Sequence, residues 1–272
     1  MVATPGEGLE RLRAKTAFIC DMDGVLFHGN RLLPGAKEFV AWLTGRGKKF
    51  LFLTNSSERS PRELQQKLAR MEIKVGEEHF YTSALATASF LASQRPYGSA
   101  YVIGETGLTN ALYEVGFSMN DVNPDYVVVG DTHSYNYERI ERAVELVRRG
   151  ARLIGTNPDL TGPGEHGIVP STGSLIAPIE RAAGRQAYFI GKPNPLMMRH
   201  ALKRLPSRRE ETVIIGDRMD TDILSGLEAE IEPVLVLSGV TRLEDLAQFA
   251  YAPAYILEGV GEIPEPQGAV SA

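Results

Sequence analysis

The stretch AFICDMDGVLFHGN, Ala17 to Asn30, places two aspartates at the end of an apolar run. Only Met22 separates Asp21 from Asp23, and Gly24 follows at once. A short apolar run that ends in this way predicts a buried strand. Burying like charges is costly unless a partner compensates them. We therefore expect a compensating group at the end of this strand, and its nature is the first indication of function.

Composition sets the class of protein. The chain has 272 residues, 43% hydrophobic and 23% charged, which is typical of a soluble globular protein with one large or two smaller domains. The net charge of −5 gives no overall attraction to a nucleic acid polymer or an anionic membrane, so an anionic substrate needs local positive groups. The single cysteine, Cys20, excludes an intramolecular disulfide and fits a cytoplasmic location. No segment resembles a signal peptide or reaches transmembrane length, and residues 1–14 are expected to form a loosely ordered extension.

Apolar runs alternate with helical patterns along the chain, which predicts an α/β fold with parallel sheets and crossover connections. The predicted strands are 16–20, 49–53, 100–103, 126–129, 152–154, 187–190, 212–215 and 233–237. Ser60, Pro61 and Glu63 form a helix-start signature, with a capping serine and a glutamate three residues later. The candidate chemical residues lie before and after a middle segment, which predicts a domain inserted into another.

Polar residues follow four of the predicted strands. In open parallel sheets, ligands bind beyond the carboxyl ends of the strands, so the four clusters are expected at one edge. They are Asp21 with Asp23, Thr54 with Asn55, Lys192, and Asp217 with Asp222.

Each cluster has a functional and a structural interpretation. Paired aspartates serve as nucleophile, metal ligand or acid/base, but Asp and Gly are also common in turns. The Thr54 hydroxyl and the Asn55 backbone N–H suit a phosphate oxygen, or they belong to a polar turn. Lys192 supplies a compact positive charge at a defined place, although most lysines are merely solvated.

The last cluster, GDRMDTDI, separates into residues with different expected roles. Asp217 is placed like a metal ligand. Asp220 is expected to have a structural role, and Asp222 is expected to hold the metal ligands in place without binding the metal itself. Asp21, Asp23 and Asp217 would repel one another without a divalent cation, and an all-oxygen set of ligands favours Mg²⁺. The histidines are scattered without ligand spacing, which argues against zinc.

These ordered motifs resemble those of the haloacid dehalogenase superfamily of phosphatases. CDMDGVLFHGNRLLPGA, FLTNSSERS, GTNPD, GKPNP and GDRMDTDILSG resemble the NagD-like nucleotide phosphatases in particular. The resemblance extends over residues 16–257. It implies a Rossmann-like parallel-sheet core, residues 1–82 and 185–272, with an inserted α/β cap, residues 83–184.

The resemblance also implies a role for each motif residue. Asp21 would be the nucleophile that forms an aspartyl-phosphate, and Asp23 the acid and then the base. Thr54, Asn55 and Lys192 would bind the transferring phosphoryl group. The metal set would be the Asp21 carboxylate, the Asp23 backbone carbonyl and Asp217. The loop formed by Arg218, Met219, Asp220 and Thr221 would lie near the phosphate and bind the substrate.

Selection among substrates requires residues outside the four motifs. The Gly/Pro-rich loop after the strand that ends at Gly155 is the candidate, because long loops in compact domains are often functional. Its Asn157 and Asp159 can hydrogen-bond a base, ribose or sugar. The alternative is a surface loop whose polar residues cap the helix that begins near Ser171 or Thr172.

The expected protein is thus a Mg²⁺-dependent phosphomonoesterase acting on a small phosphorylated metabolite, with nucleoside monophosphates as the first choice. The alternatives are a sugar-phosphate, phosphoglycolate or pyridoxal-phosphate phosphatase, and a non-catalytic phospho-acceptor module. Asp23 favours an enzyme, because a stable phospho-acceptor needs no residue that activates water. A dinucleotide-binding protein is a poor fit, since no Gly-x-Gly-x-x-Gly follows the first strand. The sequence leaves the oligomeric state open, a homo-oligomer included.

Overall fold

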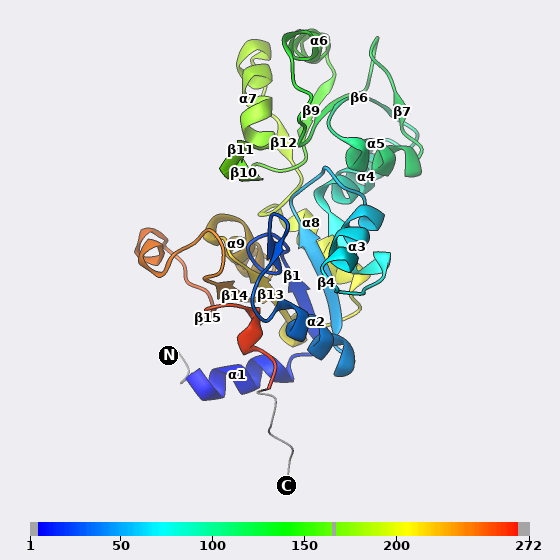
Figure 1. Ribbon diagram of the computed structural model, residues 1–272. Helices are drawn as coiled ribbons and strands as arrows, with labels where there is room; N and C mark the ends of the chain where they lie inside the picture. Colours follow the sequence, from blue (N-terminus) through cyan, green and yellow to red (C-terminus); the bar gives the residue numbers. More distant parts are fainter. Residues whose placement is uncertain (1–4, 165–166, 266–272) are drawn as a thin grey trace. The chain divides into compact units, whose positions relative to one another are not determined.

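The computed structural model describes residues 5–164 and 167–265 of the chain (Figure 1). The chain forms two compact units. The first consists of Met1–Leu53, Lys67–His79 and Met198–Ala272, and the second of Thr54–Gln66 and Phe80–Met197. The second unit is therefore inserted into the first along the sequence. The domain boundaries expected at residues 82/83 and 184/185 differ from the bounds of these units and stay a prediction.

The first unit is built on parallel strands that lie in the order β15, β14, β13, β1 and β4. Their bounds are β1 Ala17–Cys20, β4 Lys49–Thr54, β13 Thr212–Gly216, β14 Glu232–Val236 and β15 Tyr255–Leu257, and only the last residue of β4 belongs to the second unit. All four side chains of β1 are fully buried, because the strand has a neighbour on each side and cover on both faces. Cys20, the last residue of β1, pairs with Ile215 of β13 and with Phe52 of β4, so β1 ends one residue before the end of β13.

The other elements of the first unit connect and cover these strands. They are α1 Pro5–Ala14, the antiparallel pair β2 Phe27–His28 and β3 Arg31–Leu32, α2 Ala36–Gly45, η1 Glu77–His79, η2 Arg209–Glu211, the π-helical turn η3 Met219–Ile223, α9 Leu224–Glu228, η4 Leu243–Gln248 and η5 Val260–Glu262. Two helices begin in one unit and end in the other, namely α3 Pro61–Arg70 and α8 Pro195–Arg204.

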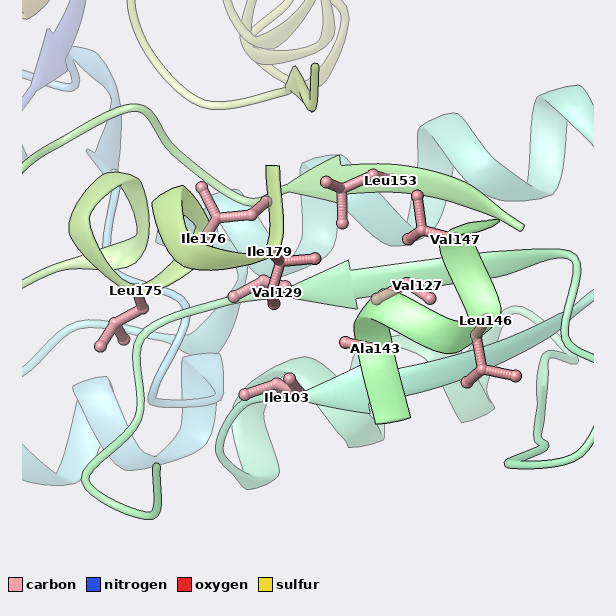
Figure 2. Packing of buried hydrophobic residues seen from close by; sticks show 10 residues of the cluster. All are labelled: Ile103, Val127, Val129, Ala143, Leu146, Val147, Leu153, Leu175, Ile176 and Ile179. Carbon is pink, nitrogen blue, oxygen red and sulfur yellow. The ribbon is translucent and has the colours of Figure 1, made fainter. Parts of the chain in front are cut away.

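The second unit contains a second parallel sheet, in the order β12, β9, β8, β6 and β7. Its elements are β5 Phe80–Thr82, α4 Ser83–Gln94, β6 Ser99–Ile103, α5 Thr106–Glu114, β7 Ser118–Met119, β8 Tyr126–Val129, α6 Tyr137–Arg148, β9 Arg152–Gly155, β10 Thr161–Gly164, β11 Gly167–Pro170, α7 Thr172–Ala183 and β12 Tyr188–Phe189. Figure 2 shows its apolar core, where Val127 and Val129 of β8 face Leu146 of α6 and Ile176 and Ile179 of α7.

The α/β class and the parallel sheets expected from the sequence are confirmed, with strand ends shifted by one or two residues. The helix start at Ser60 is also confirmed. The Ser60 backbone N–H donates to the Glu63 carboxylate at 2.8 Å, and the Ser60 hydroxyl accepts from the Glu63 backbone N–H at 3.4 Å. The sequence did not predict the short strands β2, β3, β5, β7 and β15, because runs of two or three residues are too short for a periodic signal.

The expectation of a loosely ordered amino-terminal extension is wrong for the described residues 5–14, which form α1. Leu12 is fully buried, and the Arg13 guanidinium donates from Nε to the Ile263 carbonyl at 2.6 Å. Lys48 Nζ donates to the Arg13 carbonyl at 2.7 Å. The helix is thus stabilised by contacts with distant segments, which its polar sequence does not reveal. Residues 1–4 lie outside the described range.

The loop after Gly155 is also more regular than expected, since β10 and β11 form an antiparallel hairpin within it. The helix predicted near Ser171 or Thr172 is confirmed as α7. In the described part of the chain, none of the helices has the length and apolar character needed to span a membrane.

Candidate active site

Three aspartates of the first unit form an acidic cluster, which we define as Asp21, Asp217 and Asp222. One carboxylate oxygen of each lies within 4.8 Å of the others. Asp217 and Asp222 are buried, and Asp21 is half-buried. The cluster forms because β1 and β13 are adjacent and parallel. The Asp21 backbone N–H continues the ladder by donating to the Ile215 carbonyl at 2.8 Å.

Asp217 is held by a loop that the sequence analysis did not single out. This loop, residues 238–241, follows β14, and the Val240 backbone N–H donates to Asp217 Oδ2 at 2.7 Å. The Thr241 backbone N–H donates to the Asp217 carbonyl at 3.1 Å. Its sequence, Ser-Gly-Val-Thr, shows the same signal as the four predicted clusters, namely polar residues soon after an apolar strand.

Two glycines allow the chain to approach the Asp217 carboxylate closely. A Cβ at Gly239 would lie 2.0 Å from Asp217 Oδ2, and a Cβ at Gly24 would lie 2.4 Å from the same atom. Gly24 also has a φ of +76°, which disfavours any other residue. The Ser238 hydroxyl donates to the Gly24 carbonyl at 2.7 Å and thereby joins the two segments.

Asp222 lies in the π-helical turn η3, and its Oδ2 accepts from the Arg218 backbone N–H at 3.2 Å. A Cβ at Gly216 would lie 2.1 Å from the Asp222 Cγ, so the glycine at the end of β13 makes room for this carboxylate. The sequence predicts that Asp222 supports the metal ligands without binding the metal. The structure brings its carboxylate together with those of Asp21 and Asp217.

The other residues of the predicted phosphate loop differ in exposure. Arg218 and the exposed Asp220 form an ion pair at 2.8 Å. Met219 packs against Ile223 in an apolar cluster, and Thr221 is buried. Their assignment to substrate binding stays a prediction.

Asp23 is half-buried and lies in the tight turn after β1. The Gly24 backbone N–H donates to the Phe27 carbonyl at 2.9 Å, which closes this turn into β2. Among the described residues, the carboxylates gathered in the acidic cluster do not include that of Asp23. The acid and base role expected of Asp23 stays a prediction.

Thr54, Asn55 and Lys192 lie together in the second unit, and all three are buried. The Asn55 side chain pairs with the main chain of Lys192: Oδ1 accepts from the Lys192 N–H at 2.7 Å, and Nδ2 donates to the Lys192 carbonyl at 3.0 Å. The Thr54 hydroxyl accepts from the Ser56 backbone N–H at 3.1 Å. The two motifs, far apart in sequence, are thus joined by direct hydrogen bonds.

Asn157 and Asp159 lie beside Asn55. Asp159 Oδ2 accepts from Asn55 Nδ2 at 3.0 Å, and Asn157 Nδ2 donates to the Asn55 carbonyl at 2.8 Å. Asn157 is 1% exposed, so its amide is used inside the protein. The substrate contacts expected of Asn157 and Asp159 stay predictions.

The acidic cluster fits a Mg²⁺ ion by the chemistry of its donors. It offers only carboxylate oxygens, the ligands that this ion prefers. Carboxylates at such short separations repel one another, and a divalent cation relieves this repulsion. Gly24 and Gly239 leave room for the Asp217 carboxylate beside the main chain.

We predict that Gly239→Ala weakens Mg²⁺ binding about tenfold or more, because the added methyl group displaces the Asp217 carboxylate. The measurement is calorimetric titration of the protein with Mg²⁺. Gly259→Ala is the matched control, since the nearest atom to its Cβ is Ser238 Cβ at 4.0 Å. Equal dissociation constants for Gly239→Ala and wild type would contradict the assignment of Asp217 as a ligand.

Comparisons with known proteins show the family of the chain. Residues 18–118 match the model of the haloacid dehalogenase-like hydrolases, and residues 189–263 match a second, HAD-hydrolase-like model. The dihydroxyacetone phosphatase of Corynebacterium glutamicum is 45% identical over 92% of this chain and 90% of its own length. The ribonucleotide monophosphatase NagD of Escherichia coli is 44% identical over 90% of this chain and 96% of its own length.

Solved structures show the same relationship. NagD from E. coli K-12 superposes with a TM-score of 0.86 at 43% identity, covering 92% of this chain and 99% of that one. The 4-nitrophenylphosphatase from Thermotoga maritima superposes with a TM-score of 0.88 at 33% identity, covering 93% and 97%. The chain therefore belongs to the haloacid dehalogenase-like hydrolases, and it is a phosphatase of the NagD-like group.

Proposed function

We propose that the protein is a Mg²⁺-dependent phosphomonoesterase that hydrolyses nucleoside monophosphates through an aspartyl-phosphate at Asp21. The observation that carries the proposal is the acidic cluster of Asp21, Asp217 and Asp222 at the ends of adjacent strands. A half-buried carboxylate among buried ones suits a nucleophile beside a metal site. Mg²⁺, when bound, neutralises these carboxylates and polarises the phosphoryl oxygens.

In this proposal Thr54, Asn55 and Lys192 hold the phosphoryl group. Lys192 offers a positive charge, and its main chain is fixed by Asn55. Thr54 offers its hydroxyl and Asn55 its backbone N–H. Phosphoryl transfer depends on in-line positioning and on charge stabilisation at the equatorial oxygens, which these groups provide without reacting themselves.

The chemistry takes two steps. An Asp21 oxygen attacks phosphorus, the bond from phosphorus to the ester oxygen breaks, and Asp23 gives its proton to the leaving oxygen. A water molecule then attacks phosphorus while Asp23 takes its proton. The bond to Asp21 breaks, inorganic phosphate leaves, and both aspartates return to their starting states.

Nucleoside monophosphates are the first choice because the resemblance of the motifs is to nucleotide phosphatases. NagD of E. coli and the 5'-nucleotidase YutF of Bacillus subtilis, 36% identical to this chain, are named for such substrates. Small sugar or triose phosphates are the second candidate. The 45% identical relative is a dihydroxyacetone phosphatase, and the 37% identical relative from Staphylococcus saprophyticus is an acid sugar phosphatase. We place the enzyme in the cytoplasm, consistent with its single, buried cysteine.

Phosphate release from a panel of esters tests the proposal. The panel contains nucleoside monophosphates, dihydroxyacetone phosphate, hexose phosphates, phosphoglycolate, pyridoxal phosphate and p-nitrophenyl phosphate. We expect the highest kcat/KM with a nucleoside monophosphate, loss of activity in EDTA, recovery with Mg²⁺ and a lower rate with Ca²⁺, which accepts more ligands at longer distances. A preference for dihydroxyacetone phosphate would establish the second candidate, and full activity after chelation would overturn the metal assignment.

A further inference from the structure

Asp131 is a buried carboxylate of the second unit to which neither the motifs nor the proposed reaction gives a role. It follows β8 after Gly130 and is 8% exposed. Its Oδ2 accepts from the Ser57 N–H, the Ser57 hydroxyl and Asn157 Nδ2, each at 3.2 Å. Its Oδ1 accepts from the Ser171 hydroxyl at 2.5 Å and from the N–H and hydroxyl of Thr172 at 3.0 Å. Both oxygens are therefore surrounded by donors.

We propose that Asp131 is a positioning residue for the phosphate-binding groups Thr54, Asn55 and Lys192. The inference rests on the proposed function, which assigns the phosphoryl group to these residues. Asp131 orients the Asn157 amide, which donates to the Asn55 carbonyl at 2.8 Å. The Asn55 side chain in turn fixes the Lys192 main chain. A continuous chain of hydrogen bonds thus runs from Asp131 to the lysine.

A second connection runs through Ser57, in the turn that follows Asn55. The Ser57 hydroxyl donates to the Asp131 carboxylate and accepts from the Asp131 backbone N–H at 2.9 Å. A Cβ at Gly130 would lie 2.6 Å from this hydroxyl, so Gly130 allows the close approach. The Asp131–Asn157 pair therefore holds the segment after Thr54 at two points: Asn157 binds the Asn55 carbonyl, and Asp131 binds Ser57.

The position requires a carboxylate in particular. An ionised carboxylate accepts at both oxygens and donates at neither, whereas an amide presents an NH₂ group at one side. Asn at position 131 would place that NH₂ against the donors of Ser57 and Asn157 or against those of Ser171 and Thr172. The negative charge also lies at the first turn of α7, where it interacts favourably with the helix dipole.

The test compares Asp131→Asn with Asp125→Asn. Asp125 lies directly before the first residue of β8. Its carboxylate, like that of Asp131, accepts from the N–H and hydroxyl of a serine, here Ser99 at 2.9 and 3.0 Å, but it is distant in sequence from the motif residues. Both variants are assayed in Mg²⁺ with p-nitrophenyl phosphate and with the best natural ester, and the inhibition constant of inorganic phosphate is measured. Circular dichroism at the assay temperature shows whether each variant is folded.

We expect Asp131→Asn to lower kcat/KM by about 10- to 100-fold on every ester and to raise the inhibition constant of phosphate about tenfold, because phosphate-binding groups displaced by an ångström lose this much. Asp125→Asn should keep both constants. Wild-type constants in a folded Asp131→Asn variant with only a lower Tm would overturn the inference.

Ser57→Ala provides a second variant should Asp131→Asn fail to fold, since it removes one connection and leaves the carboxylate. A several-fold rise in the phosphate inhibition constant supports the inference, and an unchanged constant contradicts it. Failure of the wild-type enzyme to release phosphate from any ester would overturn the proposed function itself. An active wild type whose kinetic constants do not change in the Asp131→Asn variant would overturn only the positioning role of Asp131.

Discussion

Asp21→Asn is expected to abolish turnover while leaving the protein folded. The amide cannot form the acyl phosphate, so the covalent step itself is lost, and removal of a nucleophile commonly lowers kcat by roughly 10⁴-fold or more. The fold should survive, because the substituted side chain is half-buried and its backbone hydrogen bond to Ile215 is unchanged. The measurement is kcat with p-nitrophenyl phosphate in saturating Mg²⁺.

Asp245→Asn is the matched control for this variant. Asp245 lies in η4 of the same unit and accepts from the Arg242 backbone N–H at 2.9 Å, so its loss is a local change in a turn. Its kcat should equal that of the wild type. Phosphate release by Asp21→Asn at a rate near that of the wild type would show that another residue attacks phosphorus.

Asp23→Asn is expected to lower kcat by roughly 10²- to 10⁴-fold with a nucleoside monophosphate, the usual contribution of general acid–base catalysis. The resemblance of its motif assigns it the acid and base role, and its carboxylate is not one of those that form the acidic cluster in the described part of the chain. The loss in the first step should be smaller with p-nitrophenyl phosphate, because nitrophenolate leaves without a proton. The measurement is the rate of nitrophenolate release in the first turnover compared with that of phosphate release.

Two results would contradict this role. An equal loss of the first step for the alkyl and the aryl ester would mean that Asp23 does not protonate the leaving oxygen. An unchanged steady-state rate of phosphate release would mean that it does not activate water. Slow release of phosphate after fast release of nitrophenolate is the pattern expected for the variant.

The part of the fold set by local pattern was predictable. Buried runs such as Phe18 to Cys20 and Val213 to Ile215 signal central parallel strands, and polar residues at their ends signal a ligand site. This pattern predicted that Asp21 and Asp217 would lie close together, as they do in the acidic cluster. The placement of Asp222 was not, because it depends on the π-helical turn after Arg218 rather than on spacing.

Features that arise from tertiary contacts were missed. Hydrogen bonds from the Arg13 guanidinium to the carbonyl groups of Ile263 and Pro264 stabilise the helix α1. The sequence of α1 alone does not predict these contacts. Asp131 reads in the sequence as an ordinary polar residue after a strand. Its importance appears only when Ser57, Asn157 and Thr172, distant in sequence, converge on its oxygens.

Trapping the phosphorylated enzyme tests the nucleophilic role of Asp21 most directly. The Asp23→Asn variant is mixed with Mg²⁺ and p-nitrophenyl phosphate, and the reaction is quenched in acid within the first turnovers. The protein is then digested, and the masses of its peptides are measured by mass spectrometry. We predict one phosphoryl group on the peptide that contains Asp21, and none when Asp21 is also replaced by Asn. A variant that releases nitrophenolate while this peptide stays unmodified, or that carries the phosphoryl group on another residue, would contradict the mechanism.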